Sequence, residues 1–339
     1  MSLTTLWFIL ICVLFIGYFF LEGFDYGVGI LLPFVGNTDL ERRAVIQTIG
    51  PVWDANEVWL LTAGGAIFAA FPQWYATMFS GFYLALFLML VGLIARGVAF
   101  EFRSKDERPL WRGLFDWLIF FGSVVPALLW GVAIANIVEG VPIDAQMNYV
   151  GNFFTLLNPY ALLGGLVTLL VFTLHGAVYL TMKTELELNA RARRAAYAVG
   201  WAAAGAAILF VLYSGLHTDM FSRPGIGMLP GVVAILAGLS LVATRLFLDR
   251  RKEGWSFFST GVAILLVVAS VFLTLFPRVM VSSLNPRWDL TVQNASSNPY
   301  SLHVMTIVAL TALPVVLAYM AWTYWVFRRR TTLTQAMHY

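Results

Sequence analysis

The sequence predicts an all-α integral membrane protein with about nine transmembrane helices, arranged as two four-helix bundles plus one peripheral helix. Two observations carry this prediction. Of the 339 residues, 60% are hydrophobic and only 12% are charged, whereas soluble domains have about 25% charged residues. The Lys and Arg residues also gather on every second connection between apolar stretches. We therefore treat residues 1–339 as a single polytopic membrane domain.

Nine apolar stretches approach the length that a helix needs to cross a bilayer, which is about 20 residues. They lie near residues 5–32, 55–71, 76–100, 114–136, 159–182, 195–215, 228–248, 257–276 and 303–327. The second stretch is the shortest. The first has no basic residues before it and is too long for the apolar core of a cleaved signal peptide, so we expect it to remain as a spanning helix. Eight of the nine spans can pair as two bundles, which leaves one helix over.

The basic residues predict the orientation of the chain, because Lys and Arg in short loops stay on the cytoplasmic side of the membrane. Of the 21 Lys and Arg residues, 17 lie on alternate connections. These are Arg42, Arg43, Arg103, Lys105, Arg108, Arg112, Lys183, Arg191, Arg193, Arg194, Arg245, Arg250, Arg251, Lys252, Arg328, Arg329 and Arg330. The N-terminus is therefore expected outside the cell and the C-terminus in the cytoplasm. Basic loops also account for the pI near 9, so nucleic acid is not an expected partner.

The connections carry two further predictions. The inner segment 37–50 mixes Leu40 and Val45 with charged residues, a pattern typical of a short helix that lies at the membrane interface. The longest outer connections, 137–158 and 277–302, are rich in Asn, Ser, Pro and Gly. They are expected to be ordered caps or contacts with a partner.

Sites built from familiar soluble-enzyme motifs are missing from the sequence. The single cysteine, Cys12, lies in an apolar run, so the chain alone can build neither a disulfide framework nor a thiolate metal site. No phosphate-binding loop, zinc-ligand spacing or nucleophile triad is present. We therefore predict no metal site and no catalytic residue of the chain's own.

Four acidic residues fall within or beside the first two spans. Ionisable groups inside hydrocarbon are costly and usually line a bundle interior or a water path. Glu22 and Asp25 are three residues apart, hence on one face of the first helix. Glu22 lies roughly 26 Å along the helix from residue 5, in its cytoplasmic half. Asp54 and Glu57 open the second span from the same side. The four acids are therefore expected to converge, as a path for proton uptake requires.

Structural roles compete with this interpretation. Asp54 and Glu57 also have the spacing of a capping box at the start of a helix. Glu22 and Asp25 could instead form a structural ion pair with Arg96 or another inner arginine. The spacing of Gly23 and Gly27 predicts close packing against another helix rather than a ligand loop.

The histidines do not form a pair suited to haem. His175 lies about 22 Å along the fifth span, while His217 and His303 lie near the outer ends of their spans and His338 is in the tail. A hydrogen-bonded helix contact is the favoured role for His175, with a haem ligand or a proton carrier as the alternatives. We predict no haem-binding residue in this chain.

Tryptophans cluster towards the ends of the spans. This distribution is typical of an aromatic belt at the two membrane interfaces. The residues concerned are Trp53, Trp59, Trp74, Trp130 and Trp325.

A series of motifs in a fixed order resembles subunit II of cytochrome bd-type quinol oxidases over nearly the whole chain. The motifs are EGFDYGVG (22–29), ERR (41–43), WDANEVWL (53–60), TAGGAIFAA (62–70), FSGFY (79–83), FRSK (102–105), GNFF (151–154), FPRVMVSS (276–283) and NASS (294–297). Their number and order make the resemblance specific.

The resemblance implies a heterodimeric terminal oxidase of the bacterial cytoplasmic membrane, in which quinol is oxidised and oxygen is reduced to water. In that family haem b, haem d and the quinol-binding loop belong to subunit I. Subunit II is thought to stabilise subunit I and to contribute to proton or oxygen access. Besides subunit I, the implied partners are membrane lipid, quinone and a small single-helix subunit.

The resemblance also assigns roles to individual residues. Asp25 and Asp54 match acidic positions linked to proton uptake, and Trp53 and Trp59 match the motif around them, where they would shape access. Glu22 and Glu57 occupy positions where relatives can carry other polar residues. His175 gains no ligand role from the family pattern.

Two other classes of function compete with an oxidase subunit. In a proton-coupled secondary transporter the same acids would couple protons to substrate, but related halves and matching broken spans are not visible in the sequence. In a purely structural scaffold the acids would only cap helix ends and form ion pairs.

Overall fold

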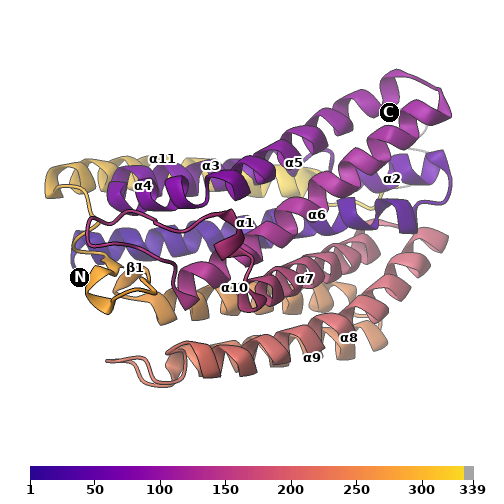
Figure 1. Cartoon of the computed structure of the whole chain (residues 1–339). Helices are drawn as coiled ribbons and strands as arrows, with labels where there is room; N and C mark the ends of the chain where they lie inside the picture. Colours follow the sequence, from indigo (N-terminus) through magenta and orange to yellow (C-terminus); the bar gives the residue numbers. More distant parts are fainter. Residues whose placement is uncertain (332–339) are drawn as a thin grey trace.

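Eleven α-helices fill most of residues 1–331, the part of the chain that the computed structural model describes. They form an elongated bundle with α1 running through its middle (Figure 1). The helices are α1 (Leu3–Val35), α2 (Asp39–Ile49), α3 (Trp53–Ala70), α4 (Pro72–Gly81), α5 (Tyr83–Phe102), α6 (Pro109–Glu139), α7 (Pro159–Lys183), α8 (Leu186–His217), α9 (Leu229–Asp249), α10 (Glu253–Leu275) and α11 (Pro299–Val326). Short antiparallel strands β1 (Arg278–Met280) and β2 (Leu290–Thr291) pair in the connection before α11.

The helices agree with the prediction of about nine spans. Eight helices within residues 1–331 are long and apolar enough to cross a membrane. The remaining predicted span, 55–71, is α3, whose first two turns carry Asp54 and Glu57. The predicted span 76–100 corresponds to α4 and α5, which are separated by one residue, Phe82, with φ −97° and ψ 14°.

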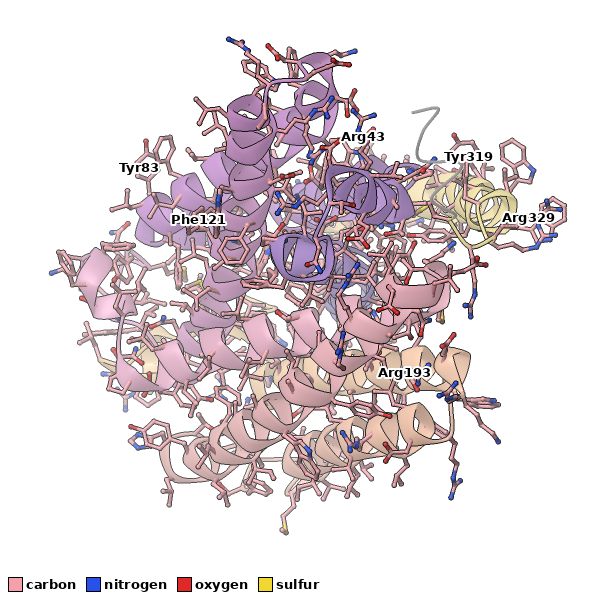
Figure 2. The ribbon with its side chains drawn as sticks, turned by 90° about the vertical axis from the view of Figure 1, so that its right-hand side faces the viewer. Arg43, Tyr83, Phe121, Arg193, Tyr319 and Arg329 are labelled. Carbon is pink, nitrogen blue, oxygen red and sulfur yellow. The ribbon has the colours of Figure 1, made fainter. Side chains whose placement is uncertain are left out.

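The helices group as the sequence predicts, in two sets of four with one helix outside. α7, α8, α9 and α10 pack on one another, and α7 also packs against α1 and α6. α1 packs against α3 and α6, and α6 packs against α5. α11 has few contacts with the rest of the bundle, and these involve α1 and α3. It lies along the edge of the molecule beside α3 (Figures 1 and 2).

Glycines allow α1 to approach α7 closely. A Cβ atom on Gly27 would lie 2.0 Å from the carbonyl oxygen of Phe172 and 2.8 Å from the Cα atom of Gly176. One turn earlier, a Cβ atom on Gly23 would meet the Phe172 ring at 2.8 Å. The predicted role of Gly23 and Gly27 in close helix packing is confirmed.

The basic connections meet at the end of the bundle opposite Met1 (Figure 1). Figure 2, which looks onto this end, shows Arg43, Arg193 and Arg329 around it. The predicted interfacial helix is α2, which begins with a capping box between Thr38 and Glu41. Ion pairs hold this end together, since carboxylates of α2, α6 and α10 accept from arginines on neighbouring segments. The pairs are Arg42–Asp116, Arg103–Asp116, Arg103–Asp39, Arg112–Asp39, Arg191–Glu41, Arg193–Glu253 and Arg330–Glu253.

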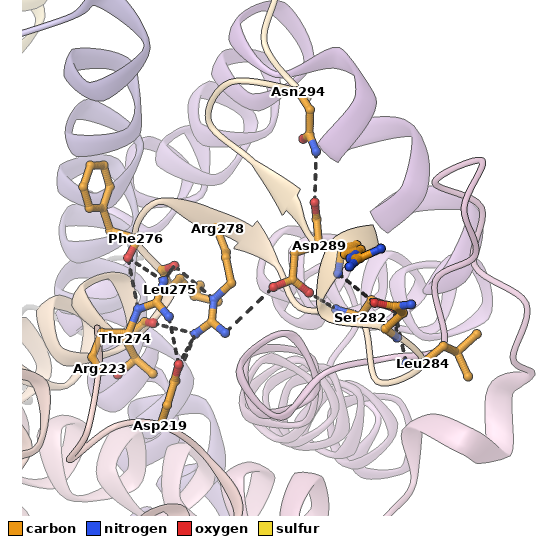
Figure 3. Close-up of polar contacts among 12 residues, drawn as sticks. Asp219, Arg223, Thr274, Leu275, Phe276, Arg278, Ser282, Leu284, Asp289 and Asn294 are labelled. Carbon is orange, nitrogen blue, oxygen red and sulfur yellow. Dashed lines mark hydrogen bonds and ion pairs between the residues drawn. The ribbon is translucent and has the colours of Figure 1, made fainter. Parts of the chain in front are cut away.

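The opposite end is closed by ordered connections, as predicted for residues 277–302. Asp219, in the connection from α8 to α9, accepts from Arg223 at 2.8 Å and from Arg278 at 2.9 Å (Figure 3). Arg223 also donates to the carbonyl oxygen of Phe276 at 2.8 Å. Asp289 accepts from the backbone N–H of Ser282 at 2.8 Å. These contacts join the α8–α9 and α10–α11 connections into one cap.

The predicted aromatic belt is only partly present. Trp74 and Trp130 are 3% and 7% exposed, so they belong to the core of the chain rather than to its surface. Trp130 stacks edge-on against Phe15 and Phe19 of α1. Sequence position near the end of a span could not separate these tryptophans from Trp325, which is 60% exposed.

Candidate functional site

A buried arginine gathers two of the predicted acids. Arg96 of α5 is fully buried, and its Nη2 atom donates to Glu22 of α1 and to Glu57 of α3. Its guanidinium also lies over the ring of Tyr26, 4.7 Å from the ring centroid. Charges can be held inside a protein when they are paired in this way. The alternative that Glu22 pairs with Arg96 is therefore confirmed.

Asp25 lies beside this ion pair but has a different partner. Its Oδ2 atom accepts from Nδ2 of Asn56 at 2.7 Å, and Oδ1 of Asn56 accepts from the hydroxyl of Tyr324 at 2.7 Å. Asp25 and Asn56 are both fully buried. The three residues come from α1, α3 and α11, so this chain of hydrogen bonds connects the peripheral helix to the centre of the bundle.

Asp54 is exposed at the surface and forms no hydrogen bond or ion pair within residues 1–331. It lines a cavity of about 170 Å³ between the start of α3 and the end of α11, together with Tyr319 and Tyr324. Tyr324 therefore borders both this cavity and the buried Asn56. Of the four predicted acids, Glu22, Asp25 and Glu57 lie close together, whereas Asp54 lies apart from them at the surface.

The alternative of a capping box formed by Asp54 and Glu57 is wrong. The residue that caps α3 is Val52, and no side chain caps the helix there. The turn at residues 50–52 starts the helix at Trp53, so Asp54 is already inside its first turn. Glu57 turns inward to Arg96 instead of back towards the start of the helix.

Several buried polar atoms in this cluster find no partner within residues 1–331. They are Oε2 of Glu22, Oδ1 of Asp25, and Nε and Nη1 of Arg96. Buried polar groups are nearly always hydrogen-bonded to protein or to ordered water. The Glu57 side chain keeps 24% exposure, which gives the cluster a route to the surface. The arrangement is chemically suited to hold water and to exchange protons between carboxyl groups.

The two tryptophans of the WDANEVWL motif flank this cluster. The ring of Trp53 packs on Phe100 of α5, with ring centroids 5.2 Å apart. Trp59 lies over Gly17 of α1 and donates from Nε1 to the sulfur of Met320 on α11 at 3.3 Å. Neither indole is hydrogen-bonded to one of the four acids within the described chain.

His175 is a helix contact, which is the favoured sequence interpretation. Its Nε2 atom lies 3.0 Å from the carbonyl oxygen of Phe20, and its Nδ1 atom lies 2.6 Å from the hydroxyl of Thr260. The imidazole also stacks on Phe257. Both ring nitrogens are engaged, so neither is free to bind iron. Within residues 1–331, no three His, Cys, Asp or Glu side chains lie close enough to hold a metal ion; His338 lies outside these residues.

Asn56 and Tyr324 were missed as site residues by sequence reasoning. Asn56 lies between Asp54 and Glu57 within the quoted motif, and its polarity in an apolar span was a usable signal. Tyr324 is separated from Asn56 by 268 positions. No local pattern distinguishes its hydroxyl from those of other tyrosines near the ends of spans.

Residues 3–327 match the family model described as "Cytochrome bd terminal oxidase subunit II". The chain belongs to this family. Membership excludes neither a structural nor a proton-transfer role for the acids, but the secondary-transporter interpretation has no support.

Relatives with this subunit's name match the chain over nearly its full length. "Cytochrome bd ubiquinol oxidase subunit 2" of Bacillus subtilis (strain 168) is 49% identical over 339 residues, which cover 100% of this chain and 99% of the relative. "Cytochrome bd-I ubiquinol oxidase subunit 2" of Escherichia coli (strain K12) is 38% identical over 362 aligned positions, which cover 96% of this chain and 94% of the relative.

The fold also matches a solved structure of the same kind of enzyme. A chain in "The structure of bd oxidase from Geobacillus thermodenitrificans" superposes with a TM-score of 0.77 and 18% sequence identity, covering 96% of this chain and 99% of that chain. At this identity the match shows the fold of the cytochrome bd oxidase subunit and not the roles of its residues.

Proposed function

We propose that this chain is the second subunit of a quinol-oxidising, oxygen-reducing complex, and that it stabilises subunit I and takes up protons from the cytoplasm. The names of its relatives specify ubiquinol oxidase subunits. The acidic cluster of Glu22, Asp25 and Glu57 supports the proton role.

Haem b and haem d are proposed to belong to subunit I and to supply the electron transfer and the oxygen chemistry of the complex. The histidines within residues 1–331 do not fit a haem. Both ring nitrogens of His175 are engaged, and His217 and His303 are exposed. Quinol is the proposed substrate of the complex. Membrane lipid, quinone and a small single-helix subunit are further proposed partners.

The proposed location of the protein is the bacterial cytoplasmic membrane, with the N-terminus outside and the C-terminus in the cytoplasm. The basic connections meet at one end of the bundle, and basic loops stay on the cytoplasmic side. This orientation turns Asp54 and its cavity towards the cytoplasm.

Protons are proposed to arrive at Asp54 and to reach Asp25, with Glu22 and Glu57 as neighbouring acceptors inside the bundle. Reduction of oxygen to water consumes protons, which must cross the apolar helices to reach the partner subunit. The observation that carries this proposal is the meeting of three carboxyl groups in the interior, where Oε2 of Glu22 and Oδ1 of Asp25 have no protein partner. Ionisable groups at such depth usually mark proton or ion pathways. Trp53 and Trp59 are proposed to line this path and to shape access to it.

The test is the replacement of Asp25 or Asp54 by Asn in the purified complex. Asn keeps the shape of the side chain but cannot exchange a carboxyl proton, so oxygen reduction should slow by about tenfold or more. Haem content and the reduction of haem by quinol should remain as in the wild type.

Asp249→Asn is the matched control, because Asp249 ends α9 in the other bundle and its side chain is 48% exposed. Its turnover should equal that of the wild type. Wild-type turnover in both Asp25→Asn and Asp54→Asn complexes would refute the proton path and leave the acids a structural role only.

A further inference from the structure

The orientation of the Asp25 carboxyl group depends on a single side chain. Within residues 1–331 its only hydrogen-bond partner is Asn56, which donates from Nδ2 to Oδ2 at 2.7 Å. Asp25 is fully buried, and the adjacent Arg96 donates to Glu22 and Glu57 rather than to Asp25. The Asn56 amide is therefore the hydrogen-bond donor that stabilises a charged Asp25, and the positive charge of the adjacent Arg96 adds to this effect.

The Asn56 amide is in turn held by Tyr324. The Tyr324 hydroxyl donates to Oδ1 of Asn56 at 2.7 Å, which keeps the NH₂ group turned towards Asp25. Asn56 has no exposure, so without this donor its carbonyl oxygen would be a buried acceptor without a partner. Leaving a buried acceptor unpaired is costlier than the net gain of the hydrogen bond. The Tyr324 hydroxyl thus favours the amide orientation that suits the charged carboxylate.

Tyr324 also stands at the boundary between the surface and the interior. Its side chain lines the 170 Å³ cavity that contains Asp54, and its hydroxyl reaches the buried Asn56. Its helix, α11, is peripheral and has only one buried residue, Leu302. The hydrogen bond from Tyr324 is therefore one of the few side-chain contacts that tie α11 to the acidic cluster.

We propose that Tyr324 is a positioning residue for proton uptake, which acts through Asn56 to hold Asp25 in the geometry that accepts and releases a proton. This inference rests on the proposed function of Asp25. A hydroxyl suits this position because it donates to the amide oxygen while Asp25 is charged and can accept from the amide NH₂ group while Asp25 is protonated. Phenylalanine would retain the ring but support neither arrangement.

A double-mutant cycle on the purified complex tests the proposal. Turnover, the KM for quinol and haem content are measured for the wild type, Tyr324→Phe, Asp25→Asn and the double variant. Tyr324→Phe should lower kcat by about threefold to tenfold, the effect of one lost hydrogen bond, with KM and haem content unchanged. If Tyr324 acts through Asp25, it should cause no further loss in the Asp25→Asn background.

Tyr319→Phe is the matched control. Tyr319 lines the same cavity on the same helix, but its hydroxyl forms no hydrogen bond within residues 1–331, so kcat should not change. Asn56→Ser is a second variant that removes the amide donor directly, and it should likewise lower kcat only when Asp25 is present.

The outcomes separate this inference from the proposed function. Slow turnover of Asp25→Asn with wild-type turnover of Tyr324→Phe would overturn the role of Tyr324 and leave the proton path intact. Full additivity of the two losses would also overturn it, because Tyr324 would then act elsewhere. Wild-type turnover of Asp25→Asn would remove Asp25 from the proton path, and the role of Tyr324 would fall with it.

Discussion

Arg96 shows how one residue sets the charge of a buried site. Its guanidinium pairs with Glu22 and Glu57, and Asp25 lies nearby. A single cation therefore faces more than one carboxyl group, and the Glu22 side chain has no exposed surface. Removing one partner of a buried ion pair typically costs about 3–5 kcal/mol, because the other charge is left uncompensated. Arg96 carries a single positive charge, so it cannot compensate the charges of several carboxylates at once.

At the α1–α7 crossing, Gly27→Ala is expected to destabilise the complex. The added methyl group would meet the carbonyl oxygen of Phe172 at 2.0 Å and the backbone of Gly176 at 2.8 Å, and backbone cannot move aside as a flexible side chain can. Overpacking of this kind costs about 1–3 kcal/mol, and the upper end is expected here. Thermal unfolding of the complex, followed by loss of haem absorbance, measures the effect.

Gly205→Ala is the matched control for this prediction. Gly205 is also within a helix, α8, but a Cβ atom there would have nothing within 4 Å. Alanine has the higher helix propensity, so stability should be unchanged or slightly raised. Equal stability of the Gly27 and Gly205 variants would show that α1 and α7 can separate without loss.

The meeting of Glu22, Asp25 and Glu57 could be predicted from the sequence, which also offered Arg96 as a partner for the first two, but the partner that each acid takes could not. The spacing of Glu22 and Asp25 placed both on one helix face, and the alternation of basic loops placed both at the inner side. Yet Glu22 binds Arg96 and Asp25 binds Asn56. Partner choice depends on where α3 and α5 lie around α1, which is a tertiary property with no local signal.

At the scale of helices, the spans were predictable because each needs a long apolar run, while their ends were less so. The start of α3 was misread as a capping box because the local spacing of Asp54 and Glu57 fits one. The structure starts the helix two residues after Pro51, which places Asp54 in the first turn. Helix α2 was located correctly because its mixed pattern of apolar and charged residues is a local feature.

The ion pair between α2 and α8 predicts a pH-dependent contribution to stability. Partial burial acts to raise the pKa of Glu41, but hydrogen bonds from Arg191 and from the backbone N–H groups of Thr38 and Asn37 outweigh it and lower the pKa below 4.5. An acid with a lowered folded-state pKa contributes stability above its unfolded-state pKa and loses it as the pH falls. Glu41 should therefore stabilise the complex at pH 7 and cease to do so in acid.

Glu41→Gln tests this contribution without removing the cap. Gln at this position of a capping box can still accept from the backbone, so the substitution removes mainly the charge that faces Arg191. The Tm should fall by about 1–3 °C at pH 7, and the gap to the wild type should close as the pH drops below about 4.5. A Tm difference that stays constant over this range would assign the effect to packing rather than to charge.

Within residues 1–331, α3 and α11 expose a broad apolar surface. α11 has a single buried residue, and large apolar side chains on α3 and α11 point away from the bundle. They include Val58, Leu61, Phe68, Ile307, Val308, Leu310, Val315, Val316 and Leu317. Such a surface is expected in a subunit of a terminal oxidase complex, because permanent subunit contacts are more apolar than transient ones. Membrane lipid or subunit I must cover this surface, which lies next to Asp54 and Tyr324.

The distribution of histidines leads to a prediction for the whole complex, which concerns His175. Replacing His175 by Gln should leave the b- and d-type haem absorbance of the complex unchanged. His175 is fully buried, and its two ring nitrogens face Phe20 and Thr260, contacts that a Gln amide can partly replace because it carries both a donor and an acceptor. An optical spectrum of the purified complex, normalised to protein, measures the haem.

Loss of one haem signal while both subunits remain together would place an iron ligand in this chain and would contradict the division in which subunit I alone binds haem. A fall in Tm with a full spectrum is the expected result, since the hydrogen bonds of His175 join α7 to α1 and α10.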